Sequence, residues 1–303
     1  MSKIFAVIVT YNGMQHDWIE KCLTSLEQST MPVTAIVVDN NSTDGTREYV
    51  PEHFPDAVWF PQEKNLGFGQ ANNLGIKYAL DNGADYILLL NQDATIHPDA
   101  LRLLTDASDG ESLLSPVHLN GDGTKLDEMF RISIKPKDGM LFSDLLLNKK
   151  LEKSYETGEI CAACWLLPAD VVRKIGGFNP LFFHYGEDNN YYQRLVYHKV
   201  KTLLVPQATM RHDRVFYGNE VAFNKNKYRR DVSLITCDIN LSLQKRLFQL
   251  LRLLVRSYAY ELPKHAYKPG SFLREMLWTT FHINTIQASR KKEKNTGLTW
   301  IEK

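Results

Sequence analysis

The stretch TAIVVDNNSTDGT, residues 34–46, joins an apolar run to a loop of small and polar residues. The run ends in Asp39, and the seven residues after it include no apolar side chain. Asn, Asp, Ser and Gly favour turns because their side chains bond the nearby backbone or because they tolerate left-handed conformations. We therefore predict a buried strand at 34–40 that opens into a loop. In open α/β sheets, ligands bind beside such loops at the carboxyl ends of parallel strands.

The segments around this stretch alternate between apolar runs and amphipathic segments. Three further runs predict strands, namely IFAVIVT at 4–10, AVWFPQ at 57–62 and YILLLNQD at 86–93. Apolar residues at helical spacing predict helices at 17–29, at 69–83, which Gly83 closes, and at 97–107, with Pro98 in its first turn. The order βαβαβ predicts an α/β fold with a mostly parallel sheet.

The second half of the chain is less regular and ends in a basic extension. Residues 160–178 predict a strand and a helix, and residues 241–256 predict a helix with apolar residues on more than one face. Residues 241–303 hold 12 Lys and Arg against 4 Asp and Glu, a net charge of +8, while residues 1–240 carry −7. We predict one domain at 1–240 and a basic helical extension at 241–303, which suits an anionic partner.

The composition is that of a globular protein with a real core, since 44% of the 303 residues are apolar. No stretch approaches the roughly 18 apolar residues of a membrane-spanning helix, and the N-terminus shows no cleavage site, so we expect a cytoplasmic protein. Cys161 and Cys164 form a CxxC without a second ligand pair. We predict reduced thiols in a buried strand there, in preference to a zinc or redox site.

Two aspartates follow predicted strands, Asp39 after AIVV and Asp93 after YILLLNQ. Because neighbouring parallel strands end at the same edge of a sheet, we expect both carboxylates to face one crevice. Asp93 suits Mg²⁺ or Mn²⁺, which one or two carboxylates hold together with substrate phosphates. Asp39 suits a donor group such as a base N–H. Either aspartate alone is also typical of an ordinary turn at a strand end.

Two other segments carry glycine and acidic residues. NLGFGQANNLG, at 65–75, resembles a phosphate-binding loop but lacks the lysine of a P-loop. FFHYGEDNNYYQRL places Glu187 and Asp188 after an aromatic loop, and His212 follows in MRHDR. An acidic pair in such a position also suits a solvated helix start. Neither segment alone identifies a function.

The order of these segments is that of a known family. VIVTYNG, VVDNNSTDGT, NLGFGQANNLGI, LLLNQDA, GGFNPLFFHYGEDNNYYQRL and a later RH together resemble the family 2 glycosyltransferases of the GT-A fold. The likeness is closest to the rhamnosyltransferase-like members that build bacterial surface polysaccharides, and it spans residues 4 to about 215. It implies a Rossmann-like GT-A sheet flanked by helices, followed by the C-terminal helical extension.

The resemblance implies a binding site for a nucleotide-sugar. The base and ribose are expected to contact Thr10, Tyr11, Asn12 and Asp39. The turn formed by Asn65 to Gly67, together with Asn73 and Gly75, is expected to lie along the donor.

The resemblance also implies a metal site and a catalytic site. Asn91 begins the metal motif, where the family often has aspartate, and belongs to the donor site. Asp93 and His212 are the implied ligands of Mg²⁺ or Mn²⁺. Asp188 is the implied catalytic base, with Glu187 beside it in the catalytic site.

The implied reaction is the inverting transfer of a sugar from a UDP- or dTDP-sugar to a hydroxyl of a glycan or lipid-linked acceptor, in cell-surface polysaccharide synthesis. Nucleic acid is not an implied partner. For the basic extension three alternatives stay open: peripheral contact with the inner face of the cell membrane, packing on the catalytic domain, or a homodimer.

Three other classes of protein compete with this interpretation. A nucleotidyltransferase is expected to carry a loop rich in Gly and Arg after the first strand, and TYNGMQHDW is not such a loop. A processive synthase needs spanning helices and a QxxRW motif, and the sequence has neither. A non-catalytic module that binds nucleotide-sugar or glycan stays open, because only a working acidic pair distinguishes it from an enzyme.

Overall fold

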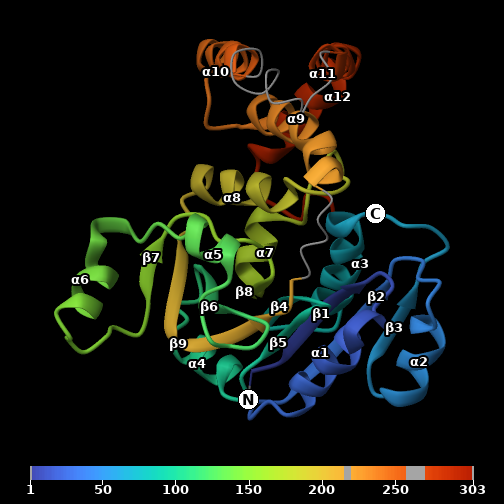
Figure 1. The fold of residues 1–303 in the computed structure, drawn as a ribbon, viewed down its shortest axis with the longest axis vertical. Helices are drawn as coiled ribbons and strands as arrows, with labels where there is room; N and C mark the ends of the chain where they lie inside the picture. The colour runs from blue at the N-terminus through green and yellow to red at the C-terminus, as the bar shows by residue number, and fades with distance from the viewer. Residues whose placement is uncertain (1, 215–219, 257–269, 302–303) are drawn as a thin grey trace.

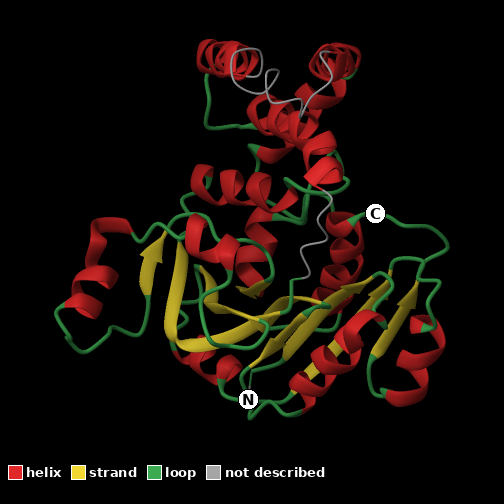
Figure 2. Cartoon of the chain, viewed as in Figure 1, coloured by secondary structure: helices red, strands yellow, loops and turns green. Residues whose placement is uncertain are grey.

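The computed structural model describes residues 2–214, 220–256 and 270–301. Within these ranges, nine strands form one sheet (Figure 1; Figure 2). They are β1 (Ile4–Thr10), β2 (Val33–Asp39), β3 (Val58–Pro61), β4 (Tyr86–Asn91), β5 (Ala94–Ile96), β6 (Leu113–Asn120), β7 (Tyr155–Thr157), β8 (Cys164–Pro168) and β9 (Thr202–His212). Their order is β3-β2-β1-β4-β8-β6-β9-β5, and β7 pairs with β9.

The first four strands run parallel, as the βαβαβ pattern predicts. β1 pairs in parallel with β2 and β4, and β2 pairs in parallel with β3. β8 is antiparallel to both of its neighbours, β4 and β6, whereas β6 and β9 are parallel. The predicted GT-A class with a mostly parallel sheet is confirmed, and the sheet is mixed because β8, and β5 and β7 beside β9, run antiparallel to their neighbours.

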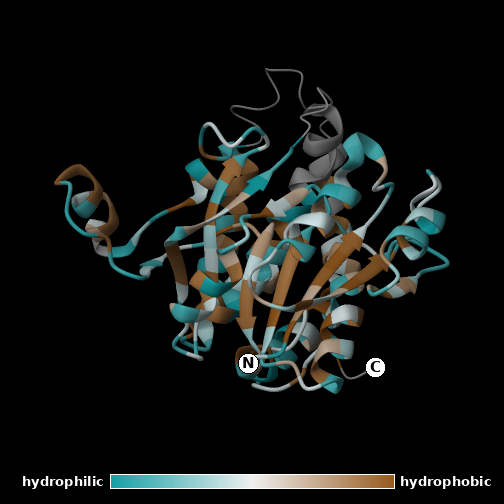
Figure 3. Ribbon diagram, turned by 90° about the horizontal axis from the view of Figure 1, so that it is seen from below, coloured by the Kyte–Doolittle hydropathy of each residue, from teal (hydrophilic) through white to brown (hydrophobic). Residues whose placement is uncertain are grey.

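Helices cover both faces of this sheet. The side chains of β1 alternate, so that Ile4, Ala6 and Ile8 pack with α1 (Trp18–Glu27) and α4 (Ala100–Asp106), while Phe5 and Val7 face the opposite side. That second side is covered by α3 (Phe68–Asp81), α7 (Ala169–Ile175) and α8 (Glu187–Tyr197). Figure 3 shows the resulting apolar strands in the middle of the molecule. Strands buried on both faces explain the continuous apolar runs of the sequence.

The predicted helices form, with two differences. α3 ends at Asp81, and Gly83 follows with φ +74°, as expected of a glycine that closes a helix. α4 begins at Ala100, so Pro98 precedes the helix and does not lie in its first turn. The reason is that the His97 N–H bonds Thr209 O (3.1 Å) and keeps this segment at the sheet. α2 (Thr46–His53) is not a predicted helix, because it is short and contains Pro51.

The C-terminal part of the chain both leaves the sheet and returns to it. α9 (Glu220–Cys237) packs with α8 and with three later helices, α10 (Leu243–Arg256), α11 (Gly270–Phe281) and α12 (Ile283–Glu293). These helices stand at the end of the molecule far from the sheet (Figure 1). The chain then returns, because the Gly177 N–H bonds Thr299 O (2.8 Å) and Ile301 is buried in the core beneath α3. The division at residue 240 stays a prediction.

A buried polar cluster fastens this returning segment to the loop before α8. The Asn179 amide donates to Ser289 Oγ (2.7 Å) and to Glu293 Oε1 (2.6 Å), both on α12. Arg194, buried on α8, donates to the carbonyls of Ile175 and Gly177. The extension therefore supports the loop that leads into Glu187.

The remaining elements flank β9. α5 (Glu128–Ser133) and α6 (Met140–Leu146) precede β7, and α6 lies in the outlying lobe at the left of Figure 1, whereas α5 lies nearer the middle of the molecule. Asp127 caps α5, since its carboxylate accepts from the Phe130 N–H (2.9 Å).

Candidate active site

Strand register brings the predicted strand-end residues to one edge of the sheet. Thr10 at the end of β1 pairs with Asp39 at the end of β2, and the preceding Val9 pairs with Asn91 at the end of β4. Three strands thus end side by side, as parallel pairing from the sequence pattern predicts.

Gln92, which the sequence analysis did not single out, links two of these strand ends. Its Oε1 accepts from Thr10 Oγ1 (2.7 Å) and from the Tyr11 N–H (2.9 Å), and its Nε2 donates to Tyr11 O (3.1 Å). The backbone at Tyr11 is therefore fixed, while the Tyr11 side chain is half exposed. An exposed aromatic ring on a fixed backbone is suited to stacking against a planar group.

The loop at 40–46 is bonded to the turn after β1. Asn12, with φ +53°, accepts from the Thr43 N–H (2.9 Å), and its own N–H bonds Ser42 Oγ (2.9 Å). The Gly13 N–H bonds Thr46 Oγ1 (2.9 Å). The turn formers of NNSTDGT thus supply side-chain acceptors and backbone donors that hold the two loops together.

Asp39 is fully buried and has a cationic partner. Arg47 Nε on α2 lies 3.0 Å from Asp39 Oδ2, and the Ser42 N–H lies 3.2 Å from Oδ1. Arg47 also donates to Gln62 O (2.8 Å). Sequence reasoning missed Arg47, because no local pattern shows that α2 turns this side chain back onto the strand end.

The four residues predicted along the donor are used in packing α3. The Gly67 N–H bonds Asn65 Oδ1 (2.8 Å), and a Cβ on Gly67, whose φ is +79°, would come within 2.1 Å of Phe183 O. Asn73 bonds both backbone groups of Phe178, at 2.7 and 2.8 Å, and a Cβ on Gly75 would lie 2.4 Å from Val7. Their contact with a donor stays a prediction.

This close packing places the acidic pair beside the start of α3. A Cβ on Gly69 would lie 3.6 Å from Glu187 Cβ. The glycine-rich segment therefore lets the loop 178–186 and Glu187 approach the first turn of α3. The sequence does not predict these contacts of the loop and of Glu187 with α3, because the segments that meet are more than one hundred residues apart.

The predicted metal ligands meet where β4 ends and β9 ends. Asp93 Oδ1 lies 3.2 Å from His212 Nε2, and Asn91 Nδ2 lies 3.5 Å from the same nitrogen. Asn91 Oδ1 is buried without a hydrogen-bond partner among the described residues. Oxygen and imidazole donors so close together fit Mg²⁺ or Mn²⁺ whose other ligands come from a diphosphate.

No group of three or more His, Cys, Asp and Glu side chains in the described part of the chain is arranged to hold a metal by itself.

Asp127 and Arg214 stand behind the Asp93–His212 pair, and the sequence analysis names neither. Asp127 Oδ2 lies 3.7 Å from His212 Nδ1, an ion-pair distance, and 3.0 Å from Arg214 Nε. A carboxylate on the far nitrogen of a ligating histidine orients the imidazole. Burial acts to raise the pKa of Asp93, but the hydrogen bond and charge of His212 and the charge of Arg214 hold that pKa below its ordinary value.

The acidic pair opens α8 and is joined by a third carboxylate. Burial and the charge of Asp188 raise the pKa of Glu187, and burial also raises the pKa of Asp188. Burial and the charge of Asp188 likewise raise the pKa of Glu159 to about 7, although Asn189 donates a hydrogen bond to it. Sequence reasoning missed Glu159.

Arg214 connects the metal side with the acidic side. Its charge lowers the pKa of both Asp93 and Asp188, so the guanidinium lies within electrostatic reach of both carboxylates. Its Nη2 is also 3.7 Å from Sγ of Cys161, three residues before β8 begins. The four cysteines are free thiols, and Cys164 is buried in β8. Perturbed carboxylates gathered around one cation are typical of catalytic sites.

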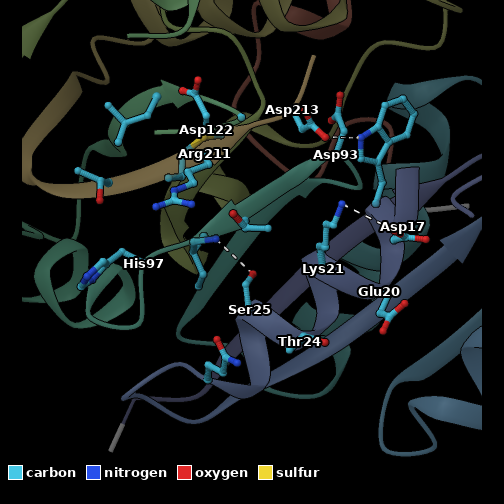
Figure 4. A pocket seen from close by; sticks show the side chains of 18 of the residues that line it. Asp17, Glu20, Lys21, Thr24, Ser25, Asp93, His97, Asp122, Arg211 and Asp213 are labelled. Atoms are coloured by element: carbon cyan, nitrogen blue, oxygen red, sulfur yellow. Dashed lines mark hydrogen bonds and ion pairs between the residues drawn. The ribbon is translucent and has the colours of Figure 1, made fainter. Parts of the chain in front are cut away.

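A pocket of about 850 Å³ lies on the α1 side of Asp93 (Figure 4). Asp93 and Asp213 lie together in it, and Trp18 Nε1 donates to Asp213 Oδ2 (3.1 Å). Asp39, Glu187 and Asp188 do not line this pocket. It therefore adjoins the candidate active site through Asp93 only.

Comparisons with known proteins identify the family of the chain. The family model for glycosyl transferase family 2 matches residues 5–176. The chain is 27% identical over 232 residues to the N-acetylglucosaminyl-diphospho-decaprenol L-rhamnosyltransferase of Mycobacterium tuberculosis, covering 69% of this chain and 75% of that protein. It is 22% identical over 294 residues to the dTDP-rhamnosyl transferase RfbF of Shigella flexneri, covering 96% and 90%.

Solved structures share the fold. S. aureus TarS 1–349 in complex with UDP is similar with a TM-score of 0.55 and 17% identity, covering 99% of this chain and 90% of that one. GalNAc-T7 with UDP, GalNAc and Mn²⁺ is similar with a TM-score of 0.63 and 14% identity, covering 99% and 56%. Because the family model matches more than half of the chain, this protein belongs to glycosyl transferase family 2.

Proposed function

We propose that this glycosyltransferase moves a sugar, with inversion, from a UDP- or dTDP-sugar to a hydroxyl of a glycan or lipid-linked acceptor in the synthesis of a cell-surface polysaccharide. The names of the two relatives support a rhamnosyl donor and a lipid-linked acceptor. The observation that carries the proposal is that Asp93 and His212 lie beside the ends of β1, β2 and β4, and that the charge of Arg214 acts on both Asp93 and Asp188 at the start of α8.

The proposed donor site uses the strand ends for the nucleoside and the Asp93 side for the diphosphate. Tyr11 presents an exposed ring, and Asp39 with Arg47 forms the floor beneath the loop 40–46. Asp93, His212 and Asn91 would hold Mg²⁺ or Mn²⁺. A divalent cation would supply positive charge to the diphosphate leaving group.

Asp188 is the proposed general base. Its ionised carboxylate would accept the proton from the acceptor hydroxyl as the oxygen attacks the anomeric carbon, opposite the leaving diphosphate. Attack from the opposite face inverts the anomeric configuration. Burial raises the pKa of Asp188, and a base with a higher pKa removes a hydroxyl proton more readily.

Saturation-transfer NMR against a panel of UDP-, dTDP- and GDP-sugars would identify the donor. We expect signal from sugar and base protons of one pyrimidine nucleotide-sugar, and the anomeric proton coupling of the transferred sugar would then report inversion. A protein that binds a nucleotide-sugar but transfers nothing to lipid-linked or glycan acceptors would be a binding module, and the proposal would be wrong. A product with retained configuration would overturn the proposed mechanism alone.

A further inference from the structure

α10 exposes an apolar face at the end of the molecule farthest from the sheet (Figure 1). Five large apolar side chains on this helix are 57–67% exposed: Leu243, Leu247, Phe248, Leu251 and Val255. At about 100° per residue they fill an arc of about 140° on the helix. The chain exposes other large apolar side chains, among them Met140, Phe142, Leu145 and Leu146 on α6, but on α10 they form one continuous stripe, which needs an explanation.

A second arc of α10 is already anchored, and it overlaps the edge of the exposed arc at Leu254. Leu250, Leu253 and Leu254 pack with Val232 of α9 and Met276 of α11. Arg246 Nη1 donates to Thr236 O (3.3 Å) on α9. The helix is therefore held in place by one side, and the exposed stripe is a second apolar face that the described chain leaves in solvent.

α11 adds a parallel stripe at the same end of the molecule. Leu273, Leu277 and Phe281 recur every fourth residue and are 49–82% exposed. Figures 1 and 2 show both helices at this end of the molecule, beyond α9, and Met276 of α11 packs with the same α9 residue, Val232, as the buried leucines of α10. We call these eight residues of α10 and α11 the distal apolar surface.

Basic residues border this surface. Lys245, Arg252 and Arg256 fall within an arc of about 40° directly beside the exposed apolar arc of α10, taking about 100° per residue. α10 contains no Asp or Glu. An exposed apolar face bordered by Lys and Arg is the pattern of a helix that lies in the interface of an anionic lipid layer.

We propose that the distal apolar surface docks on an anionic membrane, with α10 and α11 lying in the plane of the lipid headgroups. No described helix has the length and apolar content needed to cross a bilayer. At about 1.5 Å per residue, the 14 residues of α10 and 12 of α11 reach about 21 and 18 Å, which suits an in-plane position. This docking would hold the enzyme where a lipid-linked acceptor lies, but it does not depend on the reaction proposed above.

Co-sedimentation of the full chain with lipid vesicles tests the proposal. The vesicles consist of phosphatidylcholine alone or of phosphatidylcholine with phosphatidylglycerol. We expect strong binding to the anionic vesicles at low salt, weaker binding to the neutral ones, and weakening by added salt. Since the vesicles hold neither donor nor acceptor, failure here would leave the proposed reaction untouched, and failure of transfer would leave the docking untouched.

Two pairs of variants separate the apolar and the basic contributions. F248S/L251S should reduce partitioning at least about tenfold on both kinds of vesicle. K245Q/R252Q should reduce binding by about fivefold per residue on anionic vesicles only. The matched controls are F142S/L146S on α6, whose side chains are 50% and 85% exposed, and K77Q/R173Q on α3 and α7. Neither control should change binding.

Several results would overturn the proposal. The proposal is wrong if the wild-type protein does not bind anionic vesicles at low salt. It is also wrong if F142S/L146S loses binding while F248S/L251S keeps it. A wild-type dimer that F248S/L251S converts to a monomer, without vesicle binding by either, would assign the surface to a second copy of the chain. Unchanged circular dichroism and donor binding would show that each variant is folded.

Discussion

The two sides of the candidate active site differ in how well their polar groups are satisfied. On the β1–β2 side, Asp39 is paired with Arg47, and Asn12 and Gln92 bond the neighbouring turns. On the side of β4, β9 and α8, the buried atoms Asn91 Oδ1 and Glu187 Oε2 have no hydrogen-bond partner among the described residues. Because unsatisfied buried polar atoms are costly, they mark positions where a ligand is expected.

The pKa values follow the same division. Burial raises the pKa values of Glu159, Glu187 and Asp188 on the second side. We infer that the β1–β2 side is preformed to bind the nucleoside. The side of β4, β9 and α8 would be completed by the metal, the diphosphate and the acceptor. The predictions below test this contrast from the largest expected effect to the smallest.

Asp188→Asn should give the largest loss. The amide keeps the shape of the side chain but cannot accept a proton, so sugar transfer should fall about 10²–10⁴-fold while donor binding stays near that of the wild type. Steady-state transfer assays and donor titration measure the two quantities.

Glu187→Gln is the control for this variant, and it should lose less. If Glu187→Gln carries the larger loss, the roles within the pair are exchanged. In the wild type, the base must be ionised and its pKa is raised, so transfer should fall as the pH drops through that raised pKa. A rate that is flat with pH, or full transfer by both variants, would remove the catalytic role of the pair.

Arg47→Ala, on the β1–β2 side, should lower the free energy of unfolding. It leaves the fully buried Asp39 carboxylate without its cation, and removing one partner of a buried ion pair typically costs about 3 kcal/mol or more in the free energy of unfolding. Urea denaturation measures this loss.

Arg173→Ala is the matched control for Arg47→Ala, since Arg173 pairs with exposed Asp170 at 2.7 Å. Its effect should stay within about 0.5 kcal/mol. Equal losses of unfolding free energy in the two variants would show that Arg47 does not stabilise buried Asp39. The inference that the β1–β2 side is preformed would then be wrong.

Asp127→Asn should weaken metal binding without touching a proposed ligand. Asp127 lies 3.7 Å from His212 Nδ1, and loss of such an orienting carboxylate typically reduces metal affinity about 10–100-fold. Asparagine retains an oxygen that can cap α5. Mn²⁺ titration by electron paramagnetic resonance, with nucleoside diphosphate present, measures the affinity. Asp122→Asn, in an exposed turn nearby, should bind Mn²⁺ like the wild type.

Glu159→Gln should have the smallest effect, and it depends on pH. Glu159 has its pKa raised from 4.5 to about 7, so the folded chain binds this proton more tightly than the unfolded chain. Stability is therefore lost as the pH rises from 4.5 to about 7, and the variant removes that loss. Above pH 7 the variant should be more stable by on the order of 1 kcal/mol, and near pH 4 the two should match.

Glu156→Gln provides a control of opposite sign. A hydrogen bond from Lys137 lowers the pKa of Glu156, so that this carboxylate stabilises the fold above its unfolded pKa. Removing it should lower stability slightly near neutral pH. Thermal melts across pH would contradict the account if both variants shifted the melting temperature in the same direction.

The sequence predicted those parts of the molecule that depend on local pattern. The apolar runs became β1 to β4, and Gly83 closes α3 as expected. Parallel pairing explains why Asp39 and Asp93, which follow two of these strands, could be placed at one edge before any coordinates. The short α2 with its Pro51, and the antiparallel β8, carry no comparable pattern and were not predicted.

The missed residues of the site share a different property. Gln92, Arg47, Asp127, Arg214 and Glu159 act through partners that lie 8 to 87 positions away along the chain. Such contacts depend on how α2, α5 and α8 pack, and a motif cannot show that packing. Asn73 is the opposite case. Its position in the motif suggests contact with the nucleotide-sugar, but in the structure its amide bonds the backbone of Phe178.

Calorimetric titration of UDP and dTDP, with and without Mn²⁺, tests most directly whether the two sides form one donor site with separate tasks. The titration compares the wild type with Asp39→Ala and Asp93→Ala. The account predicts that Asp39→Ala weakens nucleotide binding with or without Mn²⁺, whereas Asp93→Ala removes only the affinity that Mn²⁺ adds. Identical titration curves for all three proteins would contradict it.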